Sequence, residues 1–306
     1  MSERVVTVGG NQATRPLTDF TMNASYGYDW YVNNLKTASG NGRSWNSPFI
    51  TIAEAAAAAS AGDNINIWGD GTTTHQYAES VTPTVANLKF IGRGAVPNAV
   101  IWTGITDALI VTTIVNTYAG NIRFRPASGY SGVKLTGVAN GTKVESCRFQ
   151  GTTGSKYGIV SDGHQSGVYL YNNHFLYMNA ATCYGIYAPI DAGVAENASW
   201  EIFNNMFHSN TNHIKANLRY SIVKGNTFAG TGLNSAGAQA APSKCIDFTP
   251  GSGSVGNNTI TQNMLGGAYT TALYVSSNAA EDWIGNYCAI TATTGTFGLT
   301  VAIPAA

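Results

Sequence analysis

The chain has 306 residues, with 16 basic and 16 acidic side chains, so its formal net charge is zero. A nucleic-acid-binding protein carries a basic excess, and this balance therefore argues against that class. Glycine accounts for 35 residues and aromatic residues for 11% of the chain, whereas charged residues make up only 10%. This composition excludes coiled coils and intrinsic disorder and favours a folded protein rich in β-strands and loops.

The start of the chain gives no sign of export. Residues 1–6 show no basic segment followed by an apolar one, which predicts synthesis in the cytoplasm without a signal peptide. No apolar run approaches the ~18 residues that a membrane-spanning helix needs, so we expect no membrane insertion.

Short segments in the second half of the chain share one template: an aliphatic residue, two residues, Asn, one residue, then Phe or Ile. The copies lie at 144–149, 170–175, 202–207, 223–228 and 255–260, with a shortened copy at 284–288. Cys147 replaces Asn in the first copy, and the others give a column of Asn173, Asn205, Asn226, Asn258 and Asn286. Asn tolerates a left-handed bend, and its amide can bond to the Asn of the next coil. We expect this column to tie successive coils together.

A second β pattern follows each copy and has an aliphatic residue at its second place. These residues are Ile159, Ile186, Ile214, Ile246 and Leu273. Two columns that keep the same order at similar spacing predict a solenoid whose coils stack in parallel about 4.8 Å apart. The sequence therefore predicts a parallel β-helix.

The cysteines and histidines show no spacing typical of a metal site. Cys147, Cys183, Cys245 and Cys288 form no CxxC pair and lie in coils too far apart for disulfides, so we expect four free thiols with structural roles. His75, His164, His174, His208 and His213 share no column. We expect neither a metal site nor a cofactor.

The segment 29–71 has a different character. Thr51 and Glu54 have capping-box spacing at the start of an alanine-rich helix, and Gly62 ends it. The motifs Pro48-Phe49-Ile50-Thr51-Ile52 and Gly62-Asp63-Asn64-Ile65-Asn66-Ile67 resemble the opening of the pectin-lyase-like superfamily. This resemblance extends over residues 29–290. It implies an all-β, single-domain, right-handed parallel β-helix with an N-terminal capping α-helix.

We divide the chain into four parts. Residues 1–28 form an arm or a strand that covers the first coil, 29–71 the cap, 72–290 the coils, and 291–306 a segment that covers the last coil or packs against another copy.

Alternation along the strands predicts two groups of outward side chains. On one face stand Tyr187, Lys215, Asp247 and Tyr274, and on another Tyr169, Tyr171, Glu201 and Phe203. Lys215 and Asp247 would be either a base with its partner or, as we favour, an exposed ion pair. The aromatic group would be a subunit contact, which we favour, or a platform for glycans.

Catalytic residues are not evident. Glu145 and Glu201 would lie about 12 Å apart, too far for paired glycosidase carboxylates. Asp162-Gly-His164 and His213-Ile-Lys215 faintly resemble polygalacturonase motifs, but the acidic motifs of that family are missing. We therefore assign no catalytic residue and favour a non-enzymatic protein, with an active site between subunits left open.

The superfamily that the sequence resembles includes polysaccharide lyases and hydrolases, epimerases, bacterial surface proteins and phage tailspikes. A leaderless chain with the composition of exported β-proteins is closest in character to phage virion proteins, which leave the cell by lysis. We expect a structural component of a tailed bacteriophage, either a capsid decoration protein or a tail fibre or spike module on the virion surface. We expect a homotrimer that contacts other virion proteins and host surface polysaccharide. The alternatives are a polysaccharide-cleaving lyase or hydrolase and a microbial surface adhesin.

Overall fold

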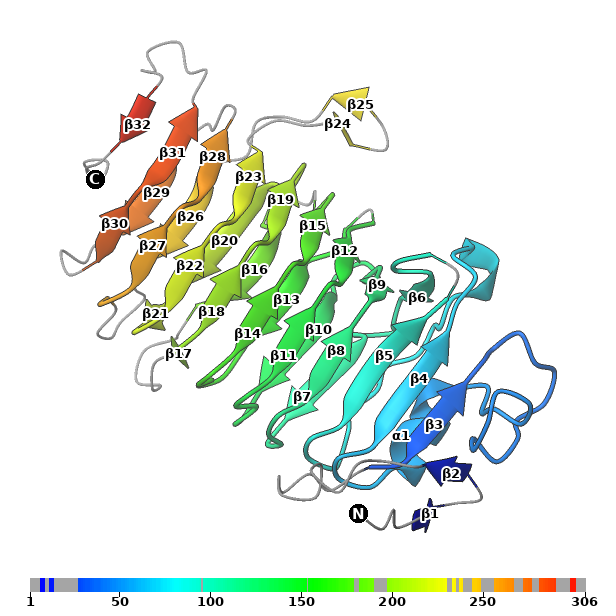
Figure 1. Cartoon of the computed structure of the whole chain (residues 1–306). Helices are drawn as coiled ribbons and strands as arrows, with labels where there is room; N and C mark the ends of the chain where they lie inside the picture. Colours follow the sequence, from blue (N-terminus) through cyan, green and yellow to red (C-terminus); the bar gives the residue numbers. More distant parts are fainter. Residues whose placement is uncertain are drawn as a thin grey trace.

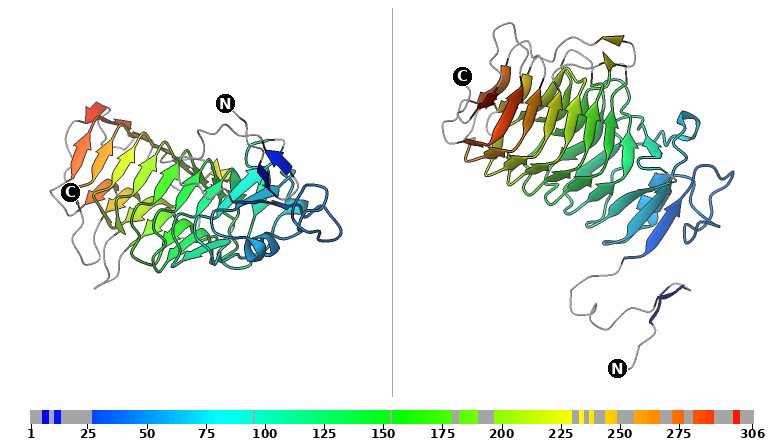
Figure 2. Two further views of the ribbon diagram at one scale, coloured as in Figure 1. Left: turned by 60° about the horizontal axis from the view of Figure 1, so that its bottom comes forward. Right: turned by 45° about the horizontal axis from the view of Figure 1, so that its top comes forward.

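The computed structural model describes residues 6–8, 11–13, 27–94, 96–152, 154–178, 182–189, 197–229, 233–234, 237–238, 244–248, 256–266, 272–276, 281–289 and 298–300. In this part of the chain, three long sheets lie side by side along one axis (Figures 1 and 2). The two strands before residue 89 both belong to the ten-stranded sheet. From residue 89 to residue 289 the strands of these sheets go to the ten-, nine- and seven-stranded sheets in turn, so each full coil adds one strand to each sheet. The molecule is a right-handed parallel β-helix, as the sequence predicts.

Each of the three long sheets is made of short strands from successive coils. The ten-stranded sheet contains β3 (Asp29–Val32), β4 (Asn64–Trp68), β5 (Lys89–Arg93), β8 (Tyr118–Gly120), β11 (Lys143–Glu145), β14 (Tyr169–Tyr171), β18 (Glu201–Phe203), β22 (Ile222–Lys224), β27 (Thr259–Thr261) and β30 (Asp282–Ile284). The nine-stranded sheet contains β6 (Val100–Trp102), β9 (Ile122–Phe124), β12 (Arg148–Gln150), β15 (His174–Leu176), β19 (Met206–His208), β23 (Thr227–Ala229), β28 (Met264–Gly266), β31 (Asn286–Ala289) and β32 (Gly298–Thr300). The seven-stranded sheet contains β7 (Leu109–Thr112), β10 (Ser131–Thr136), β13 (Tyr157–Ser161), β16 (Tyr184–Ala188), β20 (Asn212–Ala216), β26 (Lys244–Phe248) and β29 (Ala272–Ser276).

Shorter elements complete the fold. Three two-strand pairs are β1 (Val6–Val8) with β2 (Asn11–Ala13), β17 (Asn197–Ala198) with β21 (Leu218–Arg219), and β24 (Leu233–Asn234) with β25 (Gly237–Ala238). The 3-10 helix η2 spans Thr73–His75, and α1 spans Ile52–Ala58. At the far end of the chain, β32 runs antiparallel to β31. None of the described helices has the length and apolar character that crossing a membrane requires.

Helix α1 forms where the capping residues predict it. The N–H of Glu54 donates to Thr51 Oγ1 at 3.1 Å, and the N–H of Thr51 donates to Glu54 Oε2 at the same distance. Ile52, Ala55 and Ala56 are buried and belong to the hydrophobic core. The apolar side of the helix therefore packs against the first coils.

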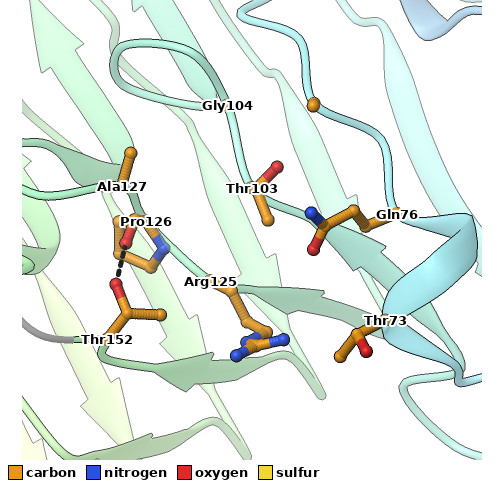
Figure 3. A pocket seen from close by; sticks show the side chains of 9 residues that line it. Thr73, Gln76, Thr103, Gly104, Arg125, Pro126, Ala127 and Thr152 are labelled. Atoms are coloured by element: carbon orange, nitrogen blue, oxygen red, sulfur yellow. Dashed lines mark hydrogen bonds between the residues drawn. The ribbon is translucent and has the colours of Figure 1, made fainter.

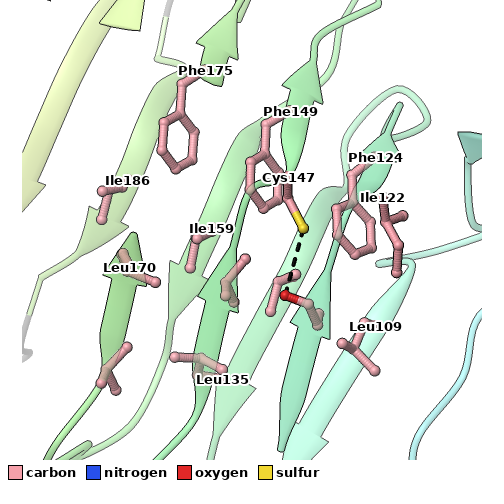
Figure 4. Close-up of a cluster of buried hydrophobic side chains, with 14 of the residues drawn as sticks. Leu109, Ile122, Phe124, Leu135, Cys147, Phe149, Ile159, Leu170, Phe175 and Ile186 are labelled. Atoms are coloured by element: carbon pink, nitrogen blue, oxygen red, sulfur yellow. Dashed lines mark hydrogen bonds between the residues drawn. The ribbon is translucent and has the colours of Figure 1, made fainter. Parts of the chain in front are cut away.

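Aromatic rings from successive coils stack inside the helix (Figure 4). Neighbouring ring centroids lie 4.7 to 5.8 Å apart along one row, Phe90, Trp102, Phe124, Phe149, Phe175, Phe207 and Phe228. Each such pair adds about 0.5 to 1.5 kcal/mol beyond the burial of its area. The Phe positions of the repeat template are thus the centre of the core.

A ladder of asparagine side chains ties the coils together at the corner between the ten- and nine-stranded sheets. Its members are Asn173, Asn205, Asn226, Asn263 and Asn286, and in each step Nδ2 of one Asn donates to Oδ1 of the next at 2.9 to 3.0 Å. All five are buried. Four of these residues were predicted, but the assignment of Asn258 to this column is wrong.

Asn258 stands at a different corner. Its Oδ1 accepts from the N–H of Ser221 at 3.0 Å, and its Nδ2 donates to the carbonyl of Leu218 at 2.9 Å. The template also fits residues 260–265, where Leu265 takes the place of Phe, and the pairing of β23 with β28 selects that copy. Overlapping copies in an Asn-rich segment caused the error.

The predicted left-handed bend lies one residue before the ladder. Asn172, Asn204 and Gln262 have φ of 56°, and Gly225 has φ of 67°. Each precedes a ladder Asn, so the bend and the amide bonding belong to adjacent columns.

Candidate functional site

The outward residues of β14 and β18 form the aromatic group that the sequence predicts. Tyr169 pairs in register with Glu201, and Tyr171 with Phe203. The rings of Tyr171 and Phe203 stack with centroids 5.4 Å apart, and Tyr171 donates a hydrogen bond from its hydroxyl to Glu201 Oε2. We call Tyr169, Tyr171, Glu201 and Phe203 the aromatic patch.

Charged groups border the aromatic patch. Lys143 Nζ lies 2.8 Å from Glu145 Oε2 and 5.1 Å from the centroid of the Tyr171 ring. Burial and the neighbouring Glu145 raise the pKa of Tyr118 to about 12, and burial together with the Glu201 bond raises the pKa of Tyr171. These phenols stay protonated at neutral pH and remain hydrogen-bond donors. The patch thus offers a stacking surface with donors and acceptors at its rim.

The two carboxylates near this patch do not form a catalytic pair. Glu145 lies on β11 and bonds to Lys143, whereas Glu201 lies on β18 and bonds to Tyr171. Strand β14 separates β11 from β18 in the sheet. The structure therefore agrees with the sequence in keeping these acids apart.

A second aromatic site on the same sheet was missed. Near its first strands, a cleft of about 420 Å³ is lined by Asp29, Tyr31, Trp45, Asn66, Trp68, Arg93 and Gly94. The Trp45 ring lies 4.8 Å from that of Tyr31 and 5.9 Å from that of Trp68. Trp45 and Trp68 occur in the cap segment, whose sequence motifs indicate only the fold. Their clustering depends on β3 and β4 being neighbours.

On the seven-stranded sheet, Tyr187 pairs in register with Lys215, and Lys215 with Asp247, as predicted. Asp247 is only 1% exposed, so the expectation of an exposed ion pair is wrong for this carboxyl group. Burial and the nearby Asp247 raise the pKa of Tyr184 to about 12. Asp247 therefore lies below the surface, where its charge acts on the Tyr184 phenol.

The predicted place of Tyr274 beside Asp247 is also wrong. In the pairing of β26 with β29, Asp247 lies opposite Val275 and Ile246 opposite Tyr274. The four residues 272–275 are all apolar or aromatic, so alternation along β29 does not fix which of them face inward. The register is one residue away from the expected one.

Two further tyrosines join Tyr187 on this face. The rings of Tyr157 and Tyr187 stack 4.4 Å apart at an angle of 5°, and the Tyr184 ring lies 5.0 Å from that of Tyr187. Beside them on β10, Lys134 forms an ion pair of 2.6 Å with Asp162. The sequence did not indicate this cluster, because Tyr157 and Tyr184 lie outside the outward column predicted next to the aliphatic residues.

The thiols agree with expectation where their side chains are described. Cys147, Cys183 and Cys245 are buried, reduced thiols, whereas the side chain of Cys288 lies outside the described residues. Among the described residues, no group of three His, Cys, Asp or Glu side chains is arranged to hold a metal ion.

Comparisons with known proteins identify only the fold of this chain. No protein-family model matches the sequence, and no curated protein matches it. An alginate lyase from Paenibacillus sp. str. FPU-7 aligns with a TM-score of 0.56 and 17% sequence identity, over 79% of this chain and 96% of that one. Pectate lyase Bsp165PelA from Bacillus sp. N165, in complex with trigalacturonate, aligns with a TM-score of 0.52 and 12% identity, over 92% and 90%.

A phage protein also aligns. The Dettilon tailspike protein has a TM-score of 0.34 at 14% identity, over 76% of this chain and 59% of that one, which is too low to support an argument. At these identities the likeness to the lyases shows the fold alone. The parallel β-helix fold expected from the sequence is confirmed.

Proposed function

We propose that this chain is a structural protein of a tailed-bacteriophage virion that contacts surface polysaccharide through the aromatic patch. It would be a capsid decoration protein or a tail fibre or spike module, assembled as a homotrimer on the virion surface. The observation that carries the glycan contact is the stacked pair of Tyr171 and Phe203 on the outer face of a sheet. Sugar rings stack on such faces, and the hydroxyl and carboxylate groups at the rim can bond to sugar hydroxyls.

The polar rim favours a glycan over a subunit contact. The core of a protein interface is depleted of charged groups. Lys143, Glu145 and Glu201 surround the Tyr171 ring. A sugar ligand would use these groups, whereas a packed subunit would have to desolvate them.

The proposal can be tested on an array of bacterial surface polysaccharides. Phe203→Ala should weaken binding about tenfold, because burying an apolar side chain of this size contributes about 1.5 to 3 kcal/mol and a sugar covers one face of the ring. Thr261→Ala, which alters an outward residue further along the same column, should bind like the wild type. If no polysaccharide binds and Phe203→Ala instead dissociates a trimer in sedimentation, the patch is a subunit interface.

A second candidate function is cleavage of an acidic polysaccharide. The two lyases of similar fold act on alginate and pectate, and the seven-stranded sheet brings Tyr187, Lys215 and Asp247 together on adjacent strands. Lysine and tyrosine side chains in such clusters serve as general bases and acids. Release of unsaturated sugars from alginate or polygalacturonate, lost in Lys215→Met, would establish this function in place of the structural one.

A further inference from the structure

The outer face of the nine-stranded sheet carries three arginines on two neighbouring coils. Arg123 lies on β9 and pairs in register with Arg148 on β12, and Arg125 follows directly after β9. We call these three residues the arginine cluster. Neighbouring strands of a sheet are about 4.8 Å apart, so the three positive charges are forced close together.

The arginine cluster lacks counter-charges within the described residues. None of the ion pairs there involves these arginines, and the Nε atom of each is buried without a hydrogen-bond partner. Burial lowers the pKa of Arg123, and the charges of Arg148 and Arg125 lower it further. Three arginines held together without an acid destabilise the fold, so stability alone does not explain them.

A cleft opens beside the arginine cluster. It has a volume of about 630 Å³, and Arg125 forms part of its wall. Figure 3 shows the Arg125 side chain between Thr152 on one side and Gln76 on the other. Thr73 and Thr103 add two more hydroxyls to the lining. The cleft therefore combines one guanidinium with groups that bond to hydroxyl-rich ligands.

Two histidines lie beside the arginine cluster along the helix axis, and burial lowers the pKa of both, so they are uncharged at neutral pH. His174 pairs in register with Arg148, and its ring lies 4.8 Å from the ring of His208. The outward positions of β9, β12 and β15 hold no acidic residue. The arginine cluster thus lies on a surface whose outward positions are free of carboxylates over three consecutive coils.

We propose that the arginine cluster and the adjoining cleft bind an acidic polysaccharide, with its carboxylates on the guanidiniums and its hydroxyls in the cleft. This site lies on a different sheet from the aromatic patch and goes beyond the function proposed above. Guanidinium groups bind carboxylates through two parallel hydrogen bonds, and carboxylates on the cluster would also offset the repulsion between its three positive charges. A chain with a carboxylate on each sugar can place charges on successive coils.

Titration with oligogalacturonate, which carries one carboxylate per sugar, tests the proposal. Arg123→Gln and Arg148→Gln should each weaken binding about tenfold, because a hydrogen bond to a charged group contributes at least about 1.5 kcal/mol. Lys89→Gln removes one exposed positive charge from the ten-stranded sheet and should leave the affinity unchanged. Neutral dextran of equal length should not bind.

Protein stability provides a second readout. Arg148→Gln relieves the repulsion on Arg123, so the variant should unfold at the same or a higher temperature while it loses affinity. Loss of both affinity and stability would mean that Arg148 supports the fold, and the proposal would be wrong.

Two other results would also overturn it. Equal affinity for poly-glutamate would identify a general anion surface or a docking site for acidic protein. Loss of oligogalacturonate binding in Phe203→Ala, with Arg123→Gln unaffected, would place the acidic glycan on the aromatic patch instead.

Discussion

Asn205 Oδ1 accepts hydrogen bonds from both the backbone N–H and the side-chain Nδ2 of Asn173, at 2.8 and 3.0 Å. Asn205 Nδ2 in turn donates to the carbonyl of Leu170 and to Asn226 Oδ1. Every polar atom of this side chain therefore bonds to another coil. Because all of these groups are buried, water cannot replace the bonds.

We predict that Asn205→Ala lowers the free energy of unfolding by about 2 to 5 kcal/mol, because it leaves several buried donors and acceptors without partners. Urea unfolding followed by circular dichroism measures the change. Asn204→Gly is the matched control: Asn204 is exposed and has a φ of 56°, a conformation that glycine adopts readily. A loss of the same size in the control would mean that the bend, and not the amide ladder, stabilises this corner.

The repeat template predicted most of this architecture because the core and the ladder both recur at a fixed offset. Phe175 and Phe207 mark the ring stack, and Asn173 and Asn205 mark the ladder, so one pattern located both. The assignment failed at Asn258, where two overlapping copies fit the template. Only the strand register distinguishes them, and register depends on contacts far apart in the sequence.

Cys147 takes the place of an Asn in the first copy of the template. Burial raises the pKa of its thiol to about 12, and the side chain is 1% exposed. A protonated, covered thiol does not react with alkylating reagents. We predict that Cys147 stays unmodified by iodoacetamide in the native protein at pH 8 and reacts in urea, as followed by peptide mass spectrometry. An introduced exposed cysteine, Thr84→Cys, should react in both conditions, and native modification of Cys147 would contradict its burial.

His213 is fully buried in a neutral form. Its Nε2 lies 3.2 Å from the carbonyl of Ala229, and its Nδ1 lies 3.3 Å from Asn210 Nδ2, so the ring donates through Nε2 and accepts through Nδ1. Burial lowers the pKa of His213 to about 3. The unfolded chain therefore takes up a proton near pH 6.5 that the folded protein excludes, and this contribution to stability is lost as the pH falls below that value.

Between pH 6 and 4, the free energy of unfolding of the wild type should decrease with each unit by which the pH falls. We predict that this decrease is smaller in His213→Gln, by about 1.4 kcal/mol per pH unit. Comparing the two proteins cancels the effect of carboxylates that titrate in the same range. His174, whose pKa burial lowers to about 4, contributes with the same sign in both proteins. Parallel pH curves for the two proteins would show that His213 is charged in the folded state.

The site was less predictable than the fold. Tyr171, Phe203 and Glu201 were found because alternation places them on one outward face. The arginine cluster was missed because nothing in the template draws attention to the position between Cys147 and Phe149. The cluster is notable because the described residues provide its arginines with no acidic partner, and only the three-dimensional packing shows this.

The first turn of α1 offers a test of the cap. The N–H groups of Thr51 and Glu54 are satisfied within the capping box, and those of Ile52 and Ala53 donate to the carboxylate of Glu79 at 2.8 and 2.9 Å. Thr51→Ala should cost about 1 kcal/mol of unfolding free energy, because it removes one of these acceptors at the helix N-terminus. Thr82→Ala, at an exposed position outside any helix, should cost much less. Equal effects in the urea midpoint would mean that the capping box does not stabilise the start of the β-helix.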